Sequence, residues 1–264
     1  MNVFWREMKA CRKSMLGWLV GIIAMVAAGM GKYAGMSETG GAMNELLAGM
    51  PKALQAVMGV GELDVSTLTG YYGMLYLYLV LMGAVHAAML GSGIVAKEER
   101  DGTAEFLLTK PISRTAVLTY KLLAGLAQIV LFNLVMLASS AVVALSYPEG
   151  GEAVRDMAAL MAGMLLVQLL FAGVGAAVAA ASRRPNRAAA ISAGVMIATF
   201  MLSVAIDMEQ RLEVLAFASP FQYFKADAVL RSGLSAGFAA LSLAATAALV
   251  SFAYAAYARR DMRI

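Results

Sequence analysis

The chain has 264 residues, of which 61% are hydrophobic and only 14% are charged, and its formal net charge is +4. Soluble globular domains carry roughly 25% charged residues, so this composition excludes an ordinary soluble domain and indicates an integral membrane protein. The single cysteine, Cys11, excludes an intramolecular disulfide. The small positive charge does not indicate a nucleic-acid partner, because its meaning depends on where the basic residues fall along the chain.

The apolar runs predict an all-α fold, a polytopic membrane protein with six transmembrane helices in a single transmembrane domain over residues 1–264. Each run is long enough for a helix to cross a hydrocarbon core of about 30 Å. The six predicted spans are residues 14–30, 70–96, 117–147, 157–181, 188–206 and 234–258.

The chain before the second span contains three further predicted features. Residues 1–13 interleave basic and apolar side chains, which predicts an interfacial helix lying at the membrane surface; an ordinary basic flank is the alternative. Gly17 and Gly21 form a GxxxG pair in the first span, a weak signal for close helix packing. An amphipathic piece over residues 44–58 is interrupted by Pro51.

The second span begins with a cluster of tyrosines, as is typical of the aromatic belt at a membrane interface. Further along this span, Gly83, Ala87 and Gly91 repeat every four residues. This repeat predicts a smooth face on which a neighbouring helix can pack closely.

Residues 97–114 are the most distinctive polar interruption between two spans. They carry eight charged side chains: Lys97, Glu98, Glu99, Arg100, Asp101, Glu105, Lys110 and Arg114. The middle, residues 103–110, is predicted to be a short amphipathic helix that Asp101-Gly102 can begin and Pro111 stops. Ser113 then stands where an N-cap would start the next helix.

The basic residues predict the orientation of the spans. With the amino terminus inside, the inner segments hold fourteen Lys and Arg residues and the outer segments hold six. Both termini and residues 97–114 are therefore expected in the cytoplasm. Residues 207–233, which are partly apolar and broken by Pro220, are expected to form short re-entrant or interfacial helices on the extracytoplasmic side.

A few polar residues lie within the predicted spans. His86 is expected to be a packed residue that hydrogen-bonds another helix, with a ligand or proton-relay role as the alternative. Gln128, Asn133 and Gln168 are expected to join helices by hydrogen bonds, although they could line a substrate path. Lys121 is expected to snorkel to the interface.

The sequence lacks the motifs of several kinds of active site. The six predicted spans contain no Asp, Glu or Arg, which disfavours a gradient-driven carrier that needs a carboxylate in the membrane. There is no Walker motif and no hydrolase motif, and one cysteine and one histidine cannot build a metal cluster. We therefore expect no catalytic site, cofactor or metal in this chain, so that any energy must come from a partner.

Three groups of residues, in the same order along the chain, resemble the type-2 ABC transporter permeases. The first group is Glu98-Glu99, Gly102-Thr103, Glu105, Leu107-Leu108, Pro111 and Ser113-Arg114, with Lys121 seven residues further on. The second is Pro51-Lys52-Ala53-Leu54, Gly59 and Gly70-Tyr71. The third is Ser219-Pro220-Phe221, Tyr223-Phe224, Ala226-Asp227 and Gly233.

The resemblance implies a six-helix membrane subunit of an ABC exporter in a bacterial cytoplasmic membrane. Such a subunit pairs with a second permease subunit, the same or a close relative, and binds two copies of a cytoplasmic ABC ATPase that holds ATP and Mg. Residues 97–114 would be the coupling loop that fits against the ATPase. The contact residues implied by position are Glu98, Glu99, Arg100, Asp101, Gly102, Thr103 and Glu105.

The main alternative is a non-transporting membrane assembly or sensor protein whose loop recruits a cytoplasmic partner; the gradient-driven carrier is a third hypothesis. The sequence does not identify a substrate, although walls that are apolar and rich in glycine favour an amphipathic or lipid-like cargo.

Overall fold

The structure is a computed structural model of the chain, and it describes residues 3–39, 41–61, 63–102, 113–182 and 185–259. Within these ranges every regular element is a helix, and six helices are long and apolar enough to cross a membrane. They are α1 (Val3–Met30), α5 (Leu68–Arg100), α7 (Arg114–Ala144), α8 (Gly150–Ala181), α9 (Pro185–Met208) and α12 (Ala236–Arg259). The predicted all-α, six-helix membrane fold is confirmed.

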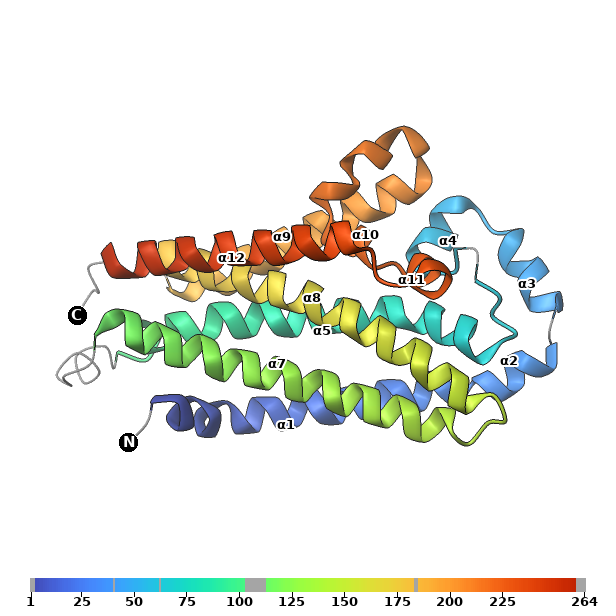
Figure 1. Cartoon of the computed structure of the whole chain (residues 1–264), viewed down its shortest axis with the longest axis horizontal. Helices are drawn as coiled ribbons and strands as arrows, with labels where there is room; N and C mark the ends of the chain where they lie inside the picture. The colour runs from blue at the N-terminus through green and yellow to red at the C-terminus, as the bar shows by residue number, and fades with distance from the viewer. Residues whose placement is uncertain (1–2, 40, 62, 103–112, 183–184, 260–264) are drawn as a thin grey trace.

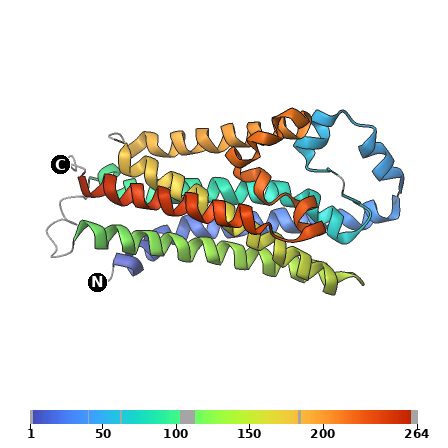
Figure 2. The same cartoon turned by 45° about the horizontal axis from the view of Figure 1, so that its top comes forward.

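The six long helices run side by side along the long axis of the molecule (Figures 1 and 2). Helices α1 and α12 bring the two ends of the chain to the same end of the bundle, where α5 also ends and α7 begins. We call this the terminal end. Six short helices gather at the opposite end.

Helices α5 and α8 form the centre of the bundle and pack most extensively against each other. The predicted small face of α5 makes this contact. A Cβ atom added to Gly91 would lie 2.2 Å from the Ala172 carbonyl oxygen, and one added to Gly175 would lie 2.5 Å from the Ala88 carbonyl oxygen. The two backbones therefore touch where only glycine fits. Gly17 and Gly21, in contrast, have no atom of another described element within 4 Å of such a Cβ.

The short helices at the opposite end are α2 (Tyr33–Thr39), α3 (Gly41–Ala48), α4 (Lys52–Met58), the 3-10 helix η1 (Gln210–Ala218), α10 (Pro220–Tyr223) and α11 (Ala226–Ser232). The predicted break at Pro51 is confirmed, since α3 ends before it and Pro51 stands at the N-cap of α4. The prediction of short helices within residues 207–233 is confirmed as well, while their position in the membrane interface stays a prediction.

Several helix boundaries differ from those predicted. Residues 3–30 form one unbroken helix, so the expected separate helix over residues 1–13 is instead the beginning of α1. Helix α5 continues through Arg100, and α8 begins at Gly150 rather than at residue 157. In each case the helix continues through charged or small residues beyond the apolar run, because backbone hydrogen bonding does not require apolar side chains.

Candidate functional site

The polar interruption between the second and third spans joins two described helix ends. Helix α5 ends at Arg100, and Gly102 follows with a φ of 65°, the left-handed conformation typical of a glycine just past a helix end. Helix α7 begins with Ser113 as its N-cap, whose hydroxyl accepts a hydrogen bond from the Ala116 amide at 3.2 Å. The N-cap prediction for Ser113 is confirmed. The predicted helix over residues 103–110, with Thr103, Glu105 and Pro111, lies outside the described residues.

Next to this loop, five charged side chains from three helices form one ionic cluster. Its members are Arg6 and Glu7 of α1, Lys97 and Glu98 of α5, and Lys121 of α7. We call these five residues the terminal-end cluster. Sequence inspection missed it, since it joins residues as far as 92 positions apart.

Glu98 and Lys121 are the centre of the terminal-end cluster. The Lys121 ammonium pairs with one carboxylate oxygen of Glu98 and donates to the Ile94 carbonyl at 2.6 Å. The other Glu98 oxygen accepts from the Arg6 guanidinium at 2.7 Å. The Lys121 side chain has 0% exposure and that of Glu98 has 7%, so the pair is inside the bundle. Lys121 therefore does not snorkel to the interface as predicted, because a buried carboxylate holds it inward.

Glu7 extends the cluster to the first helix. Its side chain is fully buried, with the Arg6 guanidinium on one carboxylate oxygen at 2.9 Å and the Lys97 ammonium on the other at 3.0 Å. The cluster thus holds three cations and two carboxylates, and its net charge is +1. Buried ions are costly unless each one is paired, and here both carboxylates have cations on both oxygens.

Two of the membrane-length helices contain a buried carboxylate, although the predicted spans contain none. Glu7 and Glu98 lie in membrane-length helices and are buried, although outside the predicted spans. Both lie at the terminal end.

The predicted contact residues are in different environments. Arg100 and Asp101 are exposed and pair with each other at 3.1 Å, and Gly102 is exposed beside them. Glu99 is half-buried, while Glu98 faces the interior of the bundle. Three of the predicted residues thus lie on the surface at the loop, and Glu98 connects the loop to the helices behind it.

The polar residues deeper in the bundle serve packing. Asn133 hydrogen-bonds Gln168, which joins α7 to α8 as predicted, while Gln128 bonds the Ala124 carbonyl of its own helix at 3.2 Å. His86 is 3% exposed and its ring stacks on Phe132, with the ring centroids 4.5 Å apart, while its Nδ1 has no hydrogen-bond partner in the described part of the chain. The expected hydrogen bond to another helix is therefore absent at Nδ1, and aromatic stacking positions the ring instead.

The whole chain can now be compared with known families. The model of the ABC-2 family transporter protein matches residues 1–262. The chain belongs to the ABC-2 transporter family. A comparison with curated proteins found no match.

Membership in the ABC-2 family makes this chain a transporter membrane subunit and implies an ABC ATPase as its partner. Lys121 is part of the residue pattern that resembles the permeases. In this ABC-2 permease, Lys121 neutralises Glu98 across the two helices that carry the loop. The signal that could have suggested the pair is a lysine inside an apolar span, 23 positions from an acid-rich helix end, because a buried lysine needs a counter-ion.

Proposed function

We propose that this ABC-2 permease is the membrane subunit of an ATP-driven exporter in a bacterial cytoplasmic membrane. Residues 97–114 would be its coupling loop, facing the cytoplasm together with both termini. Two copies of a separate ABC ATPase would bind ATP and Mg and hydrolyse the nucleotide, and a second permease subunit would complete the conduit.

The observation that best supports this proposal is the terminal-end cluster directly behind the loop. Lys121 is buried against Glu98, so the two helices that flank the loop are joined within about two turns of their ends at the loop. Arg6 and Lys97 join the same point to α1. A force applied to the loop would therefore displace three helices together instead of bending one of them.

The close backbone contact between α5 and α8 supports the next step. Displacement of α5 would be passed to α8 because Gly91 and Gly175 leave no side chain between the two backbones. A close-packed interior transmits a shift instead of absorbing it. In this mechanism the exposed residues Arg100, Asp101 and Gly102 meet the ATPase, and the buried Glu98 transmits the movement.

Purification with the ATPase tests this function. A tagged permease would be expressed in its native host and purified from the membranes in a mild detergent, and the proteins that co-purify would be identified. We expect the ATPase to co-purify, and Asp101→Arg to reduce the amount recovered several-fold. Glu152→Arg, which changes an exposed acid at the opposite end, is the matched control and should leave recovery unchanged. Failure of any ABC ATPase to co-purify, or equal effects of the two variants, would contradict the proposal.

A further inference from the structure

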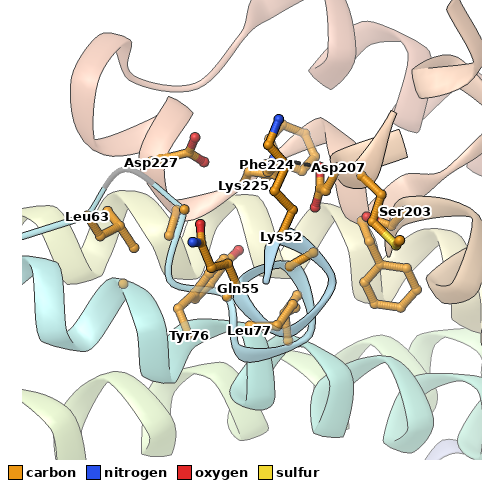
Figure 3. A pocket seen from close by; sticks show the side chains of 18 of the residues that line it. Lys52, Gln55, Leu63, Tyr76, Leu77, Ser203, Asp207, Phe224, Lys225 and Asp227 are labelled. Atoms are coloured by element: carbon orange, nitrogen blue, oxygen red, sulfur yellow. Dashed lines mark hydrogen bonds and ion pairs between the residues drawn. The ribbon is translucent and has the colours of Figure 1, made fainter. Parts of the chain in front are cut away.

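A large cleft lies at the end of the molecule opposite the terminal-end cluster. Its volume is about 730 Å³, and α4, α5, η1, α10 and α11 contribute to its walls (Figure 3). Three of these helices, η1, α10 and α11, are far apart in the sequence from α4 and α5, so the fold itself assembles the cleft. The size is that of a site for a small molecule.

One part of the cleft lining is apolar and aromatic. The side chains that form it are Tyr76, Leu77, Val80, Val167, Phe221 and Phe224. This surface suits the apolar body of a ligand, and the aromatic rings also attract a cation through their π faces.

The charged residues of the cleft lining carry an excess of negative charge. Asp207 is already neutralised, since Lys225 pairs with it at 2.8 Å and Gln222 donates to it at 2.8 Å. Four more charged residues line the cleft, and within the part of the chain that the structure describes they make no ion pair: Lys52, Glu209, Glu213 and Asp227. Three acids against one lysine leave an excess of two negative charges. Asp227 points into the opening from α11, and Lys52 rises from α4 (Figure 3).

Tyr76 places an unpartnered polar group at the bottom of the same cleft. The residue is 2% exposed, and its hydroxyl has no hydrogen-bond partner among the residues that the structure describes. Tyr76 lines the cleft, and Figure 3 shows it beneath Gln55. A buried hydroxyl without a partner costs free energy, and a ligand with a hydrogen-bond donor would remove that cost.

From these features we infer that the cleft binds a primary amine attached to an apolar body. The ammonium group pairs with Asp227 and the neighbouring acids, and an N–H or an ordered water satisfies the Tyr76 hydroxyl. The apolar body lies on Phe221, Phe224 and Leu77. This chemistry is shared by free amphiphilic amines and by lipids with an amine headgroup.

The test measures binding to the purified permease without its ATPase, so that its result is independent of the proposed export function. Dodecylamine is the probe, and dodecanoic acid, of the same length and opposite charge, is the matched ligand; both are titrated in a non-ionic detergent at neutral pH. We expect dodecylamine to bind more tightly. Asp227→Asn should weaken its binding by roughly tenfold and Tyr76→Phe by about threefold, from the usual strengths of charged and neutral hydrogen bonds.

Two further variants separate a site from general charge attraction. Lys52→Gln should strengthen dodecylamine binding, because it removes the one unpaired cation of the cleft. Glu152→Gln removes an exposed acid at the same end but outside the cleft, and should leave binding unchanged.

Displacement of the probe by phosphatidylethanolamine but not by phosphatidylglycerol would identify a lipid headgroup as the occupant, and binding of dodecylamine alone would identify a free amine. Equal affinity for the amine and the acid, or equal effects of Asp227→Asn and Glu152→Gln, would overturn the inference.

Discussion

Lys121 shows how one buried charge can join two helices. Its ammonium is enclosed by the Glu98 carboxylate and the Ile94 carbonyl, both on α5, although Lys121 belongs to α7. Removal of one partner from a buried ion pair leaves the other uncompensated, whereas removal of both leaves an apolar contact. The lysine is therefore a structural counter-ion, and its loss destabilises the fold because the buried Glu98 carboxylate loses a cation.

We predict that Lys121→Met lowers the free energy of unfolding by up to about 3–5 kcal/mol, the usual cost of breaking a buried ion pair, because Glu98 then has Arg6 on one oxygen and has lost the cation on the other. Adding Glu98→Met to the same chain should restore most of the loss. Denaturation in detergent, followed by circular dichroism, measures both variants. Arg100→Met is the control, because Arg100 makes only an exposed ion pair, which is worth about 0–1 kcal/mol. A similar small loss for Lys121→Met and Arg100→Met would show that the pair is not buried in this way.

At the scale of elements, the contact between α5 and α8 depends on glycines that face the other backbone. A methyl group on Gly91 would overlap the backbone of α8 at Ala172, and backbone atoms cannot move aside as a flexible side chain can. Gly93, on the same helix, has no atom within 4 Å of an added Cβ. The two positions therefore separate a packing effect from the general effect of replacing glycine in a helix.

We predict that Gly91→Ala destabilises the protein by about 1–3 kcal/mol, as overpacking of a close contact does. Gly93→Ala should be neutral or stabilising by up to about 1 kcal/mol, because alanine favours helix and meets no neighbour. Thermal unfolding of the two variants in the same detergent makes the comparison. If both alanines were equally tolerated, α5 and α8 would not be in backbone contact.

The elements themselves follow from local sequence. The apolar runs predicted the six long helices, Pro51 predicted the break between α3 and α4, and Ser113 predicted the start of α7. These signals depend on a few neighbouring residues, so they can be recognised in the sequence without knowledge of the three-dimensional structure. The GxxxG pair of α1 shows the limit of such signals, since it permits a close contact but does not say which neighbour supplies it.

The terminal-end cluster could not be predicted from the sequence because it depends on which helix faces meet. Glu98 belongs to the acid-rich loop pattern and was expected on the surface, but the continuation of α5 through Arg100 turns its side chain toward α7. Glu7 is likewise buried because α1 continues as a helix to Val3. The cleft at the opposite end has the same origin, as it combines α5 with short helices from two segments that are far apart in the sequence.

For the whole molecule, the structure places two different sites at opposite ends of one helix. Helix α5 has 33 residues, which corresponds to a length of about 50 Å. Tyr76 lines the cleft near one end of this helix, and Glu98 belongs to the terminal-end cluster at the other end. In the proposed exporter, this helix joins the place where ATP hydrolysis acts to the face where a ligand is bound.

The contact between the loop and the ATPase is tested most directly by cross-linking in native membranes. The permease would carry Arg100→Cys in a Cys11→Ser background, so that the exposed end of α5 bears the chain's only thiol. A short bifunctional reagent should then yield a product that contains the ABC ATPase, and a membrane-impermeant maleimide added outside the cells should leave this thiol unlabelled. Glu152→Cys in the same background is the control, and should be labelled from outside and give no ATPase product. Labelling of Arg100→Cys from outside, or an ATPase product only from Glu152→Cys, would contradict the account.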